Sequence, residues 1–201
     1  MNLWTRWRRP LRLMPPHVRE YILVHELMHG LGPHDITVDG RATTVRQELR
    51  DTYSAIEEAK ADVSGLWALQ RLIDEGYVSA EIGRTMYSTF LASMFRSLRF
   101  GITEAHGRGV AIQLNHFLNA GAVRMHRDGR FEIVEGAIRG AVAALTSEIM
   151  TLQAEGRYAM ATSMIERLGV LRPEVKALLD RLEGIPVDIA PRFVTAEALR
   201  E

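Results

Sequence analysis

The sequence predicts a mainly α-helical fold with one small β-hairpin near residues 122–134. Most apolar residues recur with the three- and four-residue spacing of a helix, and strong helix formers fill the stretches between glycines and prolines. The hairpin is expected because Asp128-Gly129 lies between two short apolar runs, which is typical of a tight turn between paired strands.

The individual helices follow from their start and stop signals. A pair of prolines opens the first helix, and a glycine-rich stretch ends it. Ser79 and Thr103 are expected to cap later helices. The polar segment 35–46 is expected to be a loop with a turn at Asp39-Gly40. Helices are expected over residues 17–29, 48–75, 79–99, 103–119, 136–155, 158–168 and 173–183.

The composition excludes several classes of protein. Hydrophobic residues make up 47% of the 201 residues and charged residues 25%, as in ordinary globular proteins. The 25 basic residues equal the 25 acidic ones, so the overall charge gives no reason to expect a nucleic-acid partner. No apolar run approaches the roughly 20 residues that a membrane span needs. Because the chain has no cysteine, a transition-metal site must use histidine and carboxylate side chains.

Residues 25–29, HELMH, form an HExxH motif on the first predicted helix. Histidines four residues apart share one helix face, so the imidazoles of His25 and His29 can bind a single metal ion. Glu26 lies beside them, where its carboxylate can take a proton from an attacking water. Zinc suits these ligands and lowers the pKa of a bound water to about 7. The apolar run 21–24 predicts a buried helix, on which polar side chains need partners.

Two residues compete to be the third metal ligand. Asp35 completes the HExxHxxGxxD spacing, which would make the protein a metzincin-like endopeptidase. Glu58 belongs to an acidic cluster on the next long predicted helix. Asp62 lies one turn further on the same face, where it could accept a hydrogen bond from a ligand imidazole. Alanine, valine and leucine crowd around this cluster, which argues against a solvated face, so we favour Glu58 over Asp35.

Two segments, HELMHGLGP at 25–33 and YSAIEEAKADVSGLWAL at 53–69, together resemble the metal site of the dipeptidyl-peptidase III family. The resemblance is strongest to the bacterial branch of that family, which consists of uncharacterised zinc hydrolases. It implies a zinc ion bound by His25, His29 and Glu58. The spacing between the two histidines is the ordinary one, whereas the eukaryotic members carry one more residue there.

The same resemblance implies roles for further residues. Glu26 corresponds to the glutamate that activates water, and Glu57 to one that supports a ligand histidine. The block FGITEAHGR is similar to the family's EAH segment, whose histidine lines the active site and helps stabilise the transition state; here it is His106. The family's arginine four residues later would fall on Val110, and Arg108 is the candidate substitute.

The resemblance covers roughly residues 17–187 and implies the helical catalytic lobe of a zinc peptidase that hydrolyses short peptides. Family members also have a large N-terminal lobe that contributes substrate-binding residues, whereas 24 residues precede His25 here. We therefore expect a catalytic half, whose apolar surface is covered by such a lobe or, in a homo-oligomer, by a second copy. If turnover requires the lobe, the chain is instead a zinc-binding fragment or interaction module without activity.

Three regions are expected along the chain. Residues 1–16 form a basic arm that bears tryptophans, residues 17–187 form the helical zinc-binding catalytic domain, and residues 188–201 form a tail. The arm lacks the apolar core of a secretory signal, so we expect the protein to be cytoplasmic.

Overall fold

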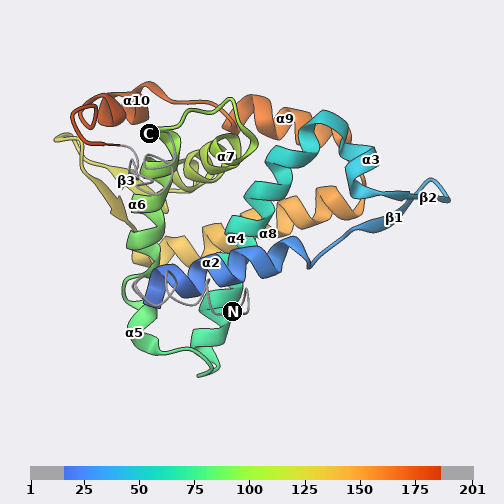
Figure 1. Ribbon diagram of the computed structural model, residues 1–201, viewed down its shortest axis with the longest axis horizontal. Helices are drawn as coiled ribbons and strands as arrows, with labels where there is room; N and C mark the ends of the chain where they lie inside the picture. Colours follow the sequence, from blue (N-terminus) through green and yellow to red (C-terminus); the bar gives the residue numbers. More distant parts are fainter. Residues whose placement is uncertain (1–15, 187–201) are drawn as a thin grey trace, which may run out of the picture.

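The computed structural model describes residues 16–186, with side chains from residue 19 onward. Helices dominate this part of the chain, and two short antiparallel hairpins accompany them (Figure 1), which confirms the mainly α prediction. The elements are α2 (Pro16–His29), β1 (Asp35–Val38), β2 (Arg41–Thr44), α3 (Val45–Leu49), the 3-10 turn η1 (Arg50–Thr52), α4 (Tyr53–Asp74), α5 (Ala80–Gly83), α6 (Met86–Leu98), α7 (Ala105–Asn119), β3 (Val123–Met125), β4 (Phe131–Ile133), α8 (Glu135–Ala154), α9 (Tyr158–Leu168) and α10 (Pro173–Asp180).

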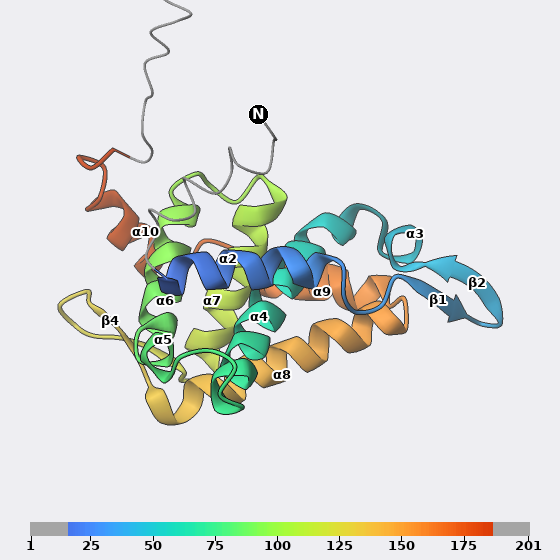
Figure 2. The ribbon, with the colours of Figure 1, turned by 60° about the horizontal axis from the view of Figure 1, so that its bottom comes forward.

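Helix α4 forms the centre of the fold. Twelve of its 22 residues are buried, which is more than one face of a helix can hold, so other elements cover it from several sides. Helices α2, α7 and α8 pack directly against it, and Figure 2 shows α4 lying between α2 and α8. The acidic cluster of the sequence is on α4, and its neighbours α2 and α7 carry the candidate histidines.

Two glycines allow the neighbouring helices to approach α4 closely. A Cβ atom added to Gly65 of α4 would lie 3.3 Å from the backbone nitrogen of His25 on α2. A Cβ atom added to Gly109 of α7 would lie 3.0 Å from the backbone nitrogen of Ala59 and 3.1 Å from Cβ of Glu58 on α4. Both close approaches occur at residues predicted to build the metal site, so the two glycines help to bring these three helices together there.

The prediction of a loop over residues 35–46 was wrong. Strands β1 and β2 pair in register from Asp35 opposite Thr44 to Val38 opposite Arg41, and the hairpin projects from the helical body (Figure 1). Its turn is at Asp39-Gly40, as predicted, where both residues have positive φ (50° and 76°). Two consecutive residues with positive φ match the twist of an antiparallel pair, so the turn directs the flanking residues into strands.

The long helix predicted from residue 48 begins later than expected. Thr44 instead caps the short helix α3, where its hydroxyl accepts from the backbone of Gln47 and the Gln47 side chain accepts from the backbone of Thr44. Arg50 then takes a positive φ of 52°, which interrupts the helical path before α4 starts at Tyr53. The interruption turns α3 away from the axis of α4.

The helix predicted over residues 79–99 is two helices. Ser79 caps α5 as expected, its hydroxyl accepting from the backbone of Glu81. Helix α5 buries no residue, whereas α6 buries an apolar stripe, so packing against the core orients α6 independently of α5. The next helix, α7, starts at Ala105, and its N-cap residue is Glu104 rather than the predicted Thr103. The loop before it folds back onto the first turn of α7, where the Gly101 carbonyl packs against Gly107.

The hairpin predicted near residues 122–134 is confirmed as β3 and β4, in register from Val123 opposite Ile133 to Met125 opposite Phe131. The basic arm and the C-terminal tail fall almost wholly outside the described residues. Within residues 16–186, no helix is both long and apolar enough to cross a membrane.

Candidate metal centre

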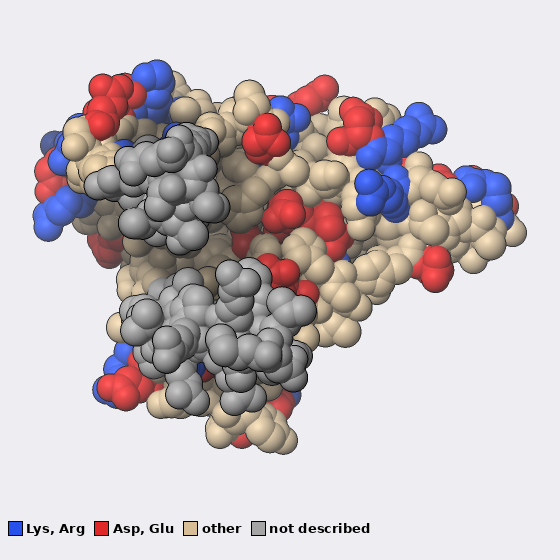
Figure 3. All heavy atoms as spheres, viewed as in Figure 1, with Lys and Arg blue, Asp and Glu red and all other residues tan. Residues whose placement is uncertain are grey.

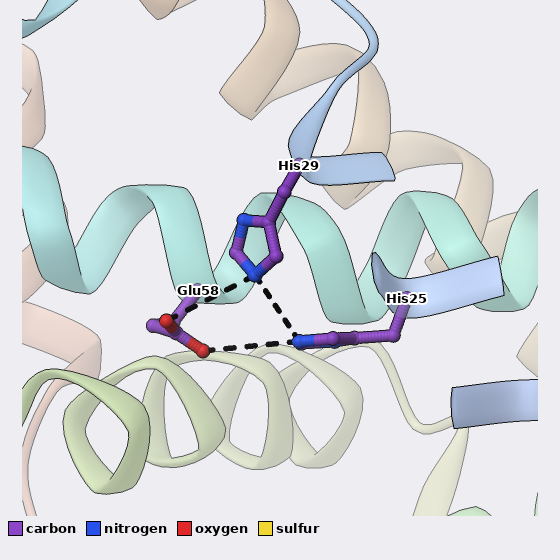
Figure 4. A group of neighbouring side chains, drawn as sticks. All are labelled: His25, His29 and Glu58. Atoms are coloured by element: carbon purple, nitrogen blue, oxygen red, sulfur yellow. Dashed lines mark hydrogen bonds and ion pairs between the residues drawn. The ribbon is translucent and has the colours of Figure 1, made fainter. Parts of the chain in front are cut away.

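Two histidine nitrogens face each other on α2. His25 and His29 are one helical turn apart, and their Nε2 atoms lie 3.2 Å from each other with the rings nearly perpendicular (Figure 4). Each ring uses its other nitrogen, Nδ1, to bind a carboxylate on α4. When both Nδ1 atoms donate to carboxylates, both Nε2 atoms present lone pairs, which is the arrangement that a cation needs.

Glu58 of α4 completes this group. Its Oε2 atom lies 4.0 Å from Nε2 of His25, and its Oε1 atom lies 4.0 Å from Nε2 of His29 (Figure 4). One ligand atom from each of the three residues falls within 4.8 Å of the other two. Figure 3 shows acidic side chains gathered where α2 crosses α4.

The donor set and its spacing fit a zinc ion. Two imidazole nitrogens bound tetrahedrally at about 2.0–2.1 Å would lie roughly 3.3 Å apart, close to the 3.2 Å between the two Nε2 atoms. Two imidazoles and one carboxylate also leave one position open, which is the pattern of catalytic rather than structural zinc sites. The residues present therefore fit the metal that the sequence motif implies.

His25 is oriented by Asp62, which is itself held by two further side chains. Asp62 Oδ1 lies 2.8 Å from Nδ1 of His25 and accepts a hydrogen bond of 2.5 Å from the Tyr21 hydroxyl. Its Oδ2 accepts from the amide of Gln113 on α7 at 2.9 Å. Since both carboxylate oxygens are bonded, Asp62 has little freedom to turn, and the His25 ring is fixed with it.

His29 has a parallel arrangement. Its Nδ1 atom lies 3.2 Å from Oε1 of Glu57, which also forms a 2.7 Å ion pair with Lys60. Oε2 of Glu57 accepts from the amide of Gln153 on α8 at 2.9 Å. The Lys60 side chain is fully buried, and its Nζ also donates to the Leu31 carbonyl at 2.8 Å, just beyond the end of α2. Lys60 therefore ties α4 to the chain that follows His29.

The charges of the site reinforce one another. Burial raises the pKa of Asp62, but the hydrogen bond and charge of His25, together with the hydrogen bonds from Tyr21 and Gln113, outweigh burial and hold that pKa below its usual range. Burial lowers the pKa of His25, but the hydrogen bond and charge of Asp62, with the charges of Glu58 and Glu26, more than compensate, so the pKa is raised. The hydrogen bond from His106 is the largest cause that lowers the pKa of Glu58. Burial, followed by the charge of Asp62, raises the pKa of Tyr21 well above 10, so the phenol remains a donor.

The other predicted residues lie at different places around the group. His106, in the first turn of α7, is half-exposed, with its Nδ1 atom 3.2 Å from Oε2 of Glu58. Glu26 is exposed and lines the same cavity as His25 and His106. Arg108 donates from Nε to the Ile102 carbonyl at 3.2 Å, so the loop before α7 holds it.

Asp35 is not part of the group. It begins strand β1, where it pairs with Thr44, and its side chain is exposed. Among the residues with described side chains, the histidines of α2 are grouped with Glu58 and not with Asp35. After α2 the chain runs through Gly32 to the projecting hairpin (Figure 1), so Asp35 lies on the hairpin and not beside the two histidines.

Sequence reasoning missed four residues that hold the site: Tyr21, Lys60, Gln113 and Gln153. Tyr21 is four residues before His25, so helical spacing could have indicated it. Gln113 and Gln153 are fully buried on helices that are otherwise apolar at those positions, and a lone amide within an apolar stripe signals a polar partner. Their partners on α4 become evident only from the packing of α7 and α8.

Fold and site together define a helical protein that groups two histidines and a glutamate as a candidate metal site. No family model matches the chain. Solved structures do match: dipeptidyl-peptidase III from Corallococcus sp. strain EGB is 58% identical with a TM-score of 0.87, over 91% of this chain and 34% of that one. DPP III from Caldithrix abyssi is 38% identical with a TM-score of 0.88, over 94% of this chain and 36% of that one. The chain is dipeptidyl-peptidase III-like in sequence and fold.

A curated relative has a different name. Nudix hydrolase 3 of Arabidopsis thaliana is 46% identical over 182 residues, which are 89% of this chain and 24% of that protein. The chain thus spans about a quarter of that relative and about a third of the two solved structures.

Proposed function

We propose that the chain is the zinc-binding, catalytic part of a peptide hydrolase. His25, His29 and Glu58 hold the metal ion, Glu26 is the general base, and the substrate is a short peptide. The observation that carries the proposal is the convergence of two histidine Nε2 atoms and one carboxylate. The Nδ1 atom of each histidine is bonded to a separate buried acid, which orients the ring. The likeness to two dipeptidyl-peptidase III structures supports the peptidase class.

The reaction would divide between the metal and the protein. When bound, zinc supplies a Lewis acid that polarises the scissile carbonyl and lowers the pKa of a coordinated water to about 7. Glu26, exposed at the edge of the group, takes a proton from the attacking water and passes it to the leaving amine. His106, half-exposed beside Glu58, donates a hydrogen bond to the carbonyl oxygen as negative charge develops there. Asp62 and Glu57 keep the two ligand rings in place throughout.

The substitution Glu26→Gln tests this division of roles. The variant should keep its zinc, because Glu26 is not among the three ligands, and should lose peptide hydrolysis by roughly 10²–10⁴-fold. The measurement is cleavage of di- to octapeptides alongside zinc content for the same samples. Glu166→Gln, at an exposed position of α9, is the matched control and should change neither. Undiminished cleavage by Glu26→Gln would remove the general-base assignment.

A second candidate function is zinc binding without turnover. It is favoured by one observation: the chain spans only 34–36% of the two solved dipeptidyl-peptidase III chains. In this case residues 17–187 would be a zinc-binding domain or interaction module that needs a further lobe for activity. Zinc content near one ion per chain with no cleavage of any peptide would favour this candidate, whereas cleavage that depends on Glu26 would exclude it. The expected location in both cases is the cytoplasm.

A further inference from the structure

A cavity opens directly beside the candidate metal centre. It lies between α2, α6 and α7 and has a volume of about 480 Å³, within the range of cavities that bind small organic groups. Three residues with roles in the proposed reaction line the cavity: His25, Glu26 and His106. Tyr21, Ile22, Phe90, Met94 and Val110 supply its apolar wall.

The apolar wall is firmly built. The Tyr21 hydroxyl is bonded to Asp62, and its ring meets Phe90 edge to face with centroids 5.2 Å apart. Met94 is almost completely buried, and its flexible thioether can adapt to the group that it contacts. The wall therefore offers aromatic and aliphatic surface immediately next to the atoms that would carry out hydrolysis.

The polar groups of the cavity do not suit a charged occupant. Asp62 is already bonded by His25, Tyr21 and Gln113, so it has no oxygen left without a partner for an incoming cation. Of the other charged residues that line the cavity, Glu26 repels an acidic group, and the guanidinium of Arg96 lies over the Phe100 ring, 5.6 Å from its centroid. A charged side chain would lose its hydration against a mainly apolar lining, whereas an apolar one gains by leaving water.

We propose that this cavity is the specificity pocket of the site and binds a large apolar side chain, of the leucine or phenylalanine kind, on a residue adjoining the hydrolysed bond. The inference rests on the proposed function, because it assumes that the peptide is held at the metal centre. It adds the substrate class: peptides with a bulky apolar residue at the cleavage point.

Binding of hydroxamates to the zinc-loaded full chain tests the pocket without requiring turnover. The hydroxamate group chelates zinc, so the probes differ only in what they place in the cavity. 3-Phenylpropionohydroxamate should bind on the order of tenfold more tightly than acetohydroxamate, as expected for burial of a phenyl group. Succinic monohydroxamate, which ends in a carboxylate, should bind no more tightly than acetohydroxamate. The measurement is the Kd of each probe by titration calorimetry.

Two leucine substitutions on α6 provide the matched pair. Ser93 lines the cavity and donates to the Phe90 carbonyl three residues before it, and the exposed Ser88 donates to the Thr85 carbonyl in the same way. Ser93→Leu should fill the cavity and reduce the advantage of the phenyl probe to within about twofold, with the Kd of acetohydroxamate unchanged. Ser88→Leu should keep the full advantage.

The outcomes separate the pocket from the proposed function. Equal Kd values for the phenyl and acetyl probes in the wild type would overturn the pocket and leave the metal centre intact. An advantage that survives in Ser93→Leu would overturn it as well. If acetohydroxamate fails to bind the zinc-loaded chain, the metal offers no open position, and both the proposed function and the pocket are wrong.

Discussion

The Nδ1 atom of His25 lies 2.8 Å from Oδ1 of Asp62, although 37 residues separate the two along the chain. This bond fixes which nitrogen of the ring is turned toward the other histidine. It also joins α2 to α4 at the point where Gly65 lets the two helices come close. The geometry of the candidate metal centre therefore depends on a buried acid that is not one of the three candidate ligands.

Replacing this acid should weaken metal binding without removing the ligands. We expect Asp62→Asn to lower zinc affinity by about 10–100-fold, since the His25 ring loses the carboxylate that orients it. Competition with a chromogenic chelator measures the affinity. Asp180→Asn, whose carboxylate pairs with Lys176 on the exposed side of α10, is the control and should bind zinc like the wild type. An unchanged affinity in Asp62→Asn would show that packing alone orients His25.

The identity of the third ligand can be decided by a pair of alanine variants. After identical dialysis, Glu58→Ala should lose its zinc while Asp35→Ala keeps about one ion per chain, because the Glu58 carboxylate lies 4.0 Å from each histidine Nε2 and Asp35 lies on the hairpin. Elemental analysis gives the zinc content. The opposite result, with zinc lost only from Asp35→Ala, would favour the metzincin-like alternative.

The extent to which the site follows from sequence depends on which elements provide it. His25 and His29, and likewise Glu58 and Asp62, are each separated by one helical turn, so periodicity places each pair on a single face. Gln113 and Gln153 come from α7 and α8, and nothing in their local sequence says which acid they will meet. Such contacts depend on how the helices pack.

The fold shows the same division between local and long-range causes. The helix at 158–168 was predicted with its observed ends because it is amphipathic and bounded by turns on both sides. The hairpin of β1 and β2 was missed because its strands have only four residues each. Ile36 and Val38 alternate with polar residues in β1, but β2 contains a single apolar residue, Ala42, so the pattern covers only one of the two strands. The turn at Asp39-Gly40 was the local signal that the sequence analysis recognised in this segment.

Lys60 should be among the most sensitive positions for stability. Lys60→Met removes the partner of Glu57 and leaves that acid charged in a buried place, at a cost of about 3–5 kcal/mol in the free energy of unfolding. Denaturant unfolding of the metal-free protein measures the change. Lys176→Met, on an exposed ion pair of α10, should leave the free energy nearly unchanged. If both variants lose a similar free energy of unfolding, the buried ion pair between Lys60 and Glu57 does not contribute more to stability than an exposed one.

The close approach of α7 to α4 should also be measurable. In Gly109→Ala the new methyl group would lie 3.0 Å from the backbone nitrogen of Ala59, so the helices must separate, at a cost of about 1–3 kcal/mol. Gly140 lies in the second turn of α8 with no atom within 4 Å of its added Cβ, and Gly140→Ala should stabilise the protein by about 0.5–1 kcal/mol. Urea unfolding of both variants provides the comparison. A stabilising effect of Gly109→Ala would show that the helices have room to spare.

His116 should make stability depend on pH. Its Nε2 atom donates to the Ala141 carbonyl at 3.1 Å, and burial, the largest cause, lowers its pKa below 6.5 although this bond and Glu148 act in the opposite direction. The unfolded chain keeps a histidine pKa near 6.5, so it binds more protons than the folded chain at slightly acidic pH. The stability that neutral His116 contributes is therefore complete above pH of about 6.5 and is lost as pH falls from there toward the lower folded pKa.

The variant His116→Gln isolates this effect. A glutamine amide can keep the donor to Ala141 but does not titrate, and the other histidines contribute equally to both proteins. We expect the free energy of unfolding of the wild type to fall relative to that of His116→Gln as pH decreases from about 7.5 to about 5. Denaturant unfolding at a series of pH values measures the difference. If the free energies of unfolding of the two proteins change with pH in parallel, the pKa of His116 does not differ between the folded and the unfolded protein.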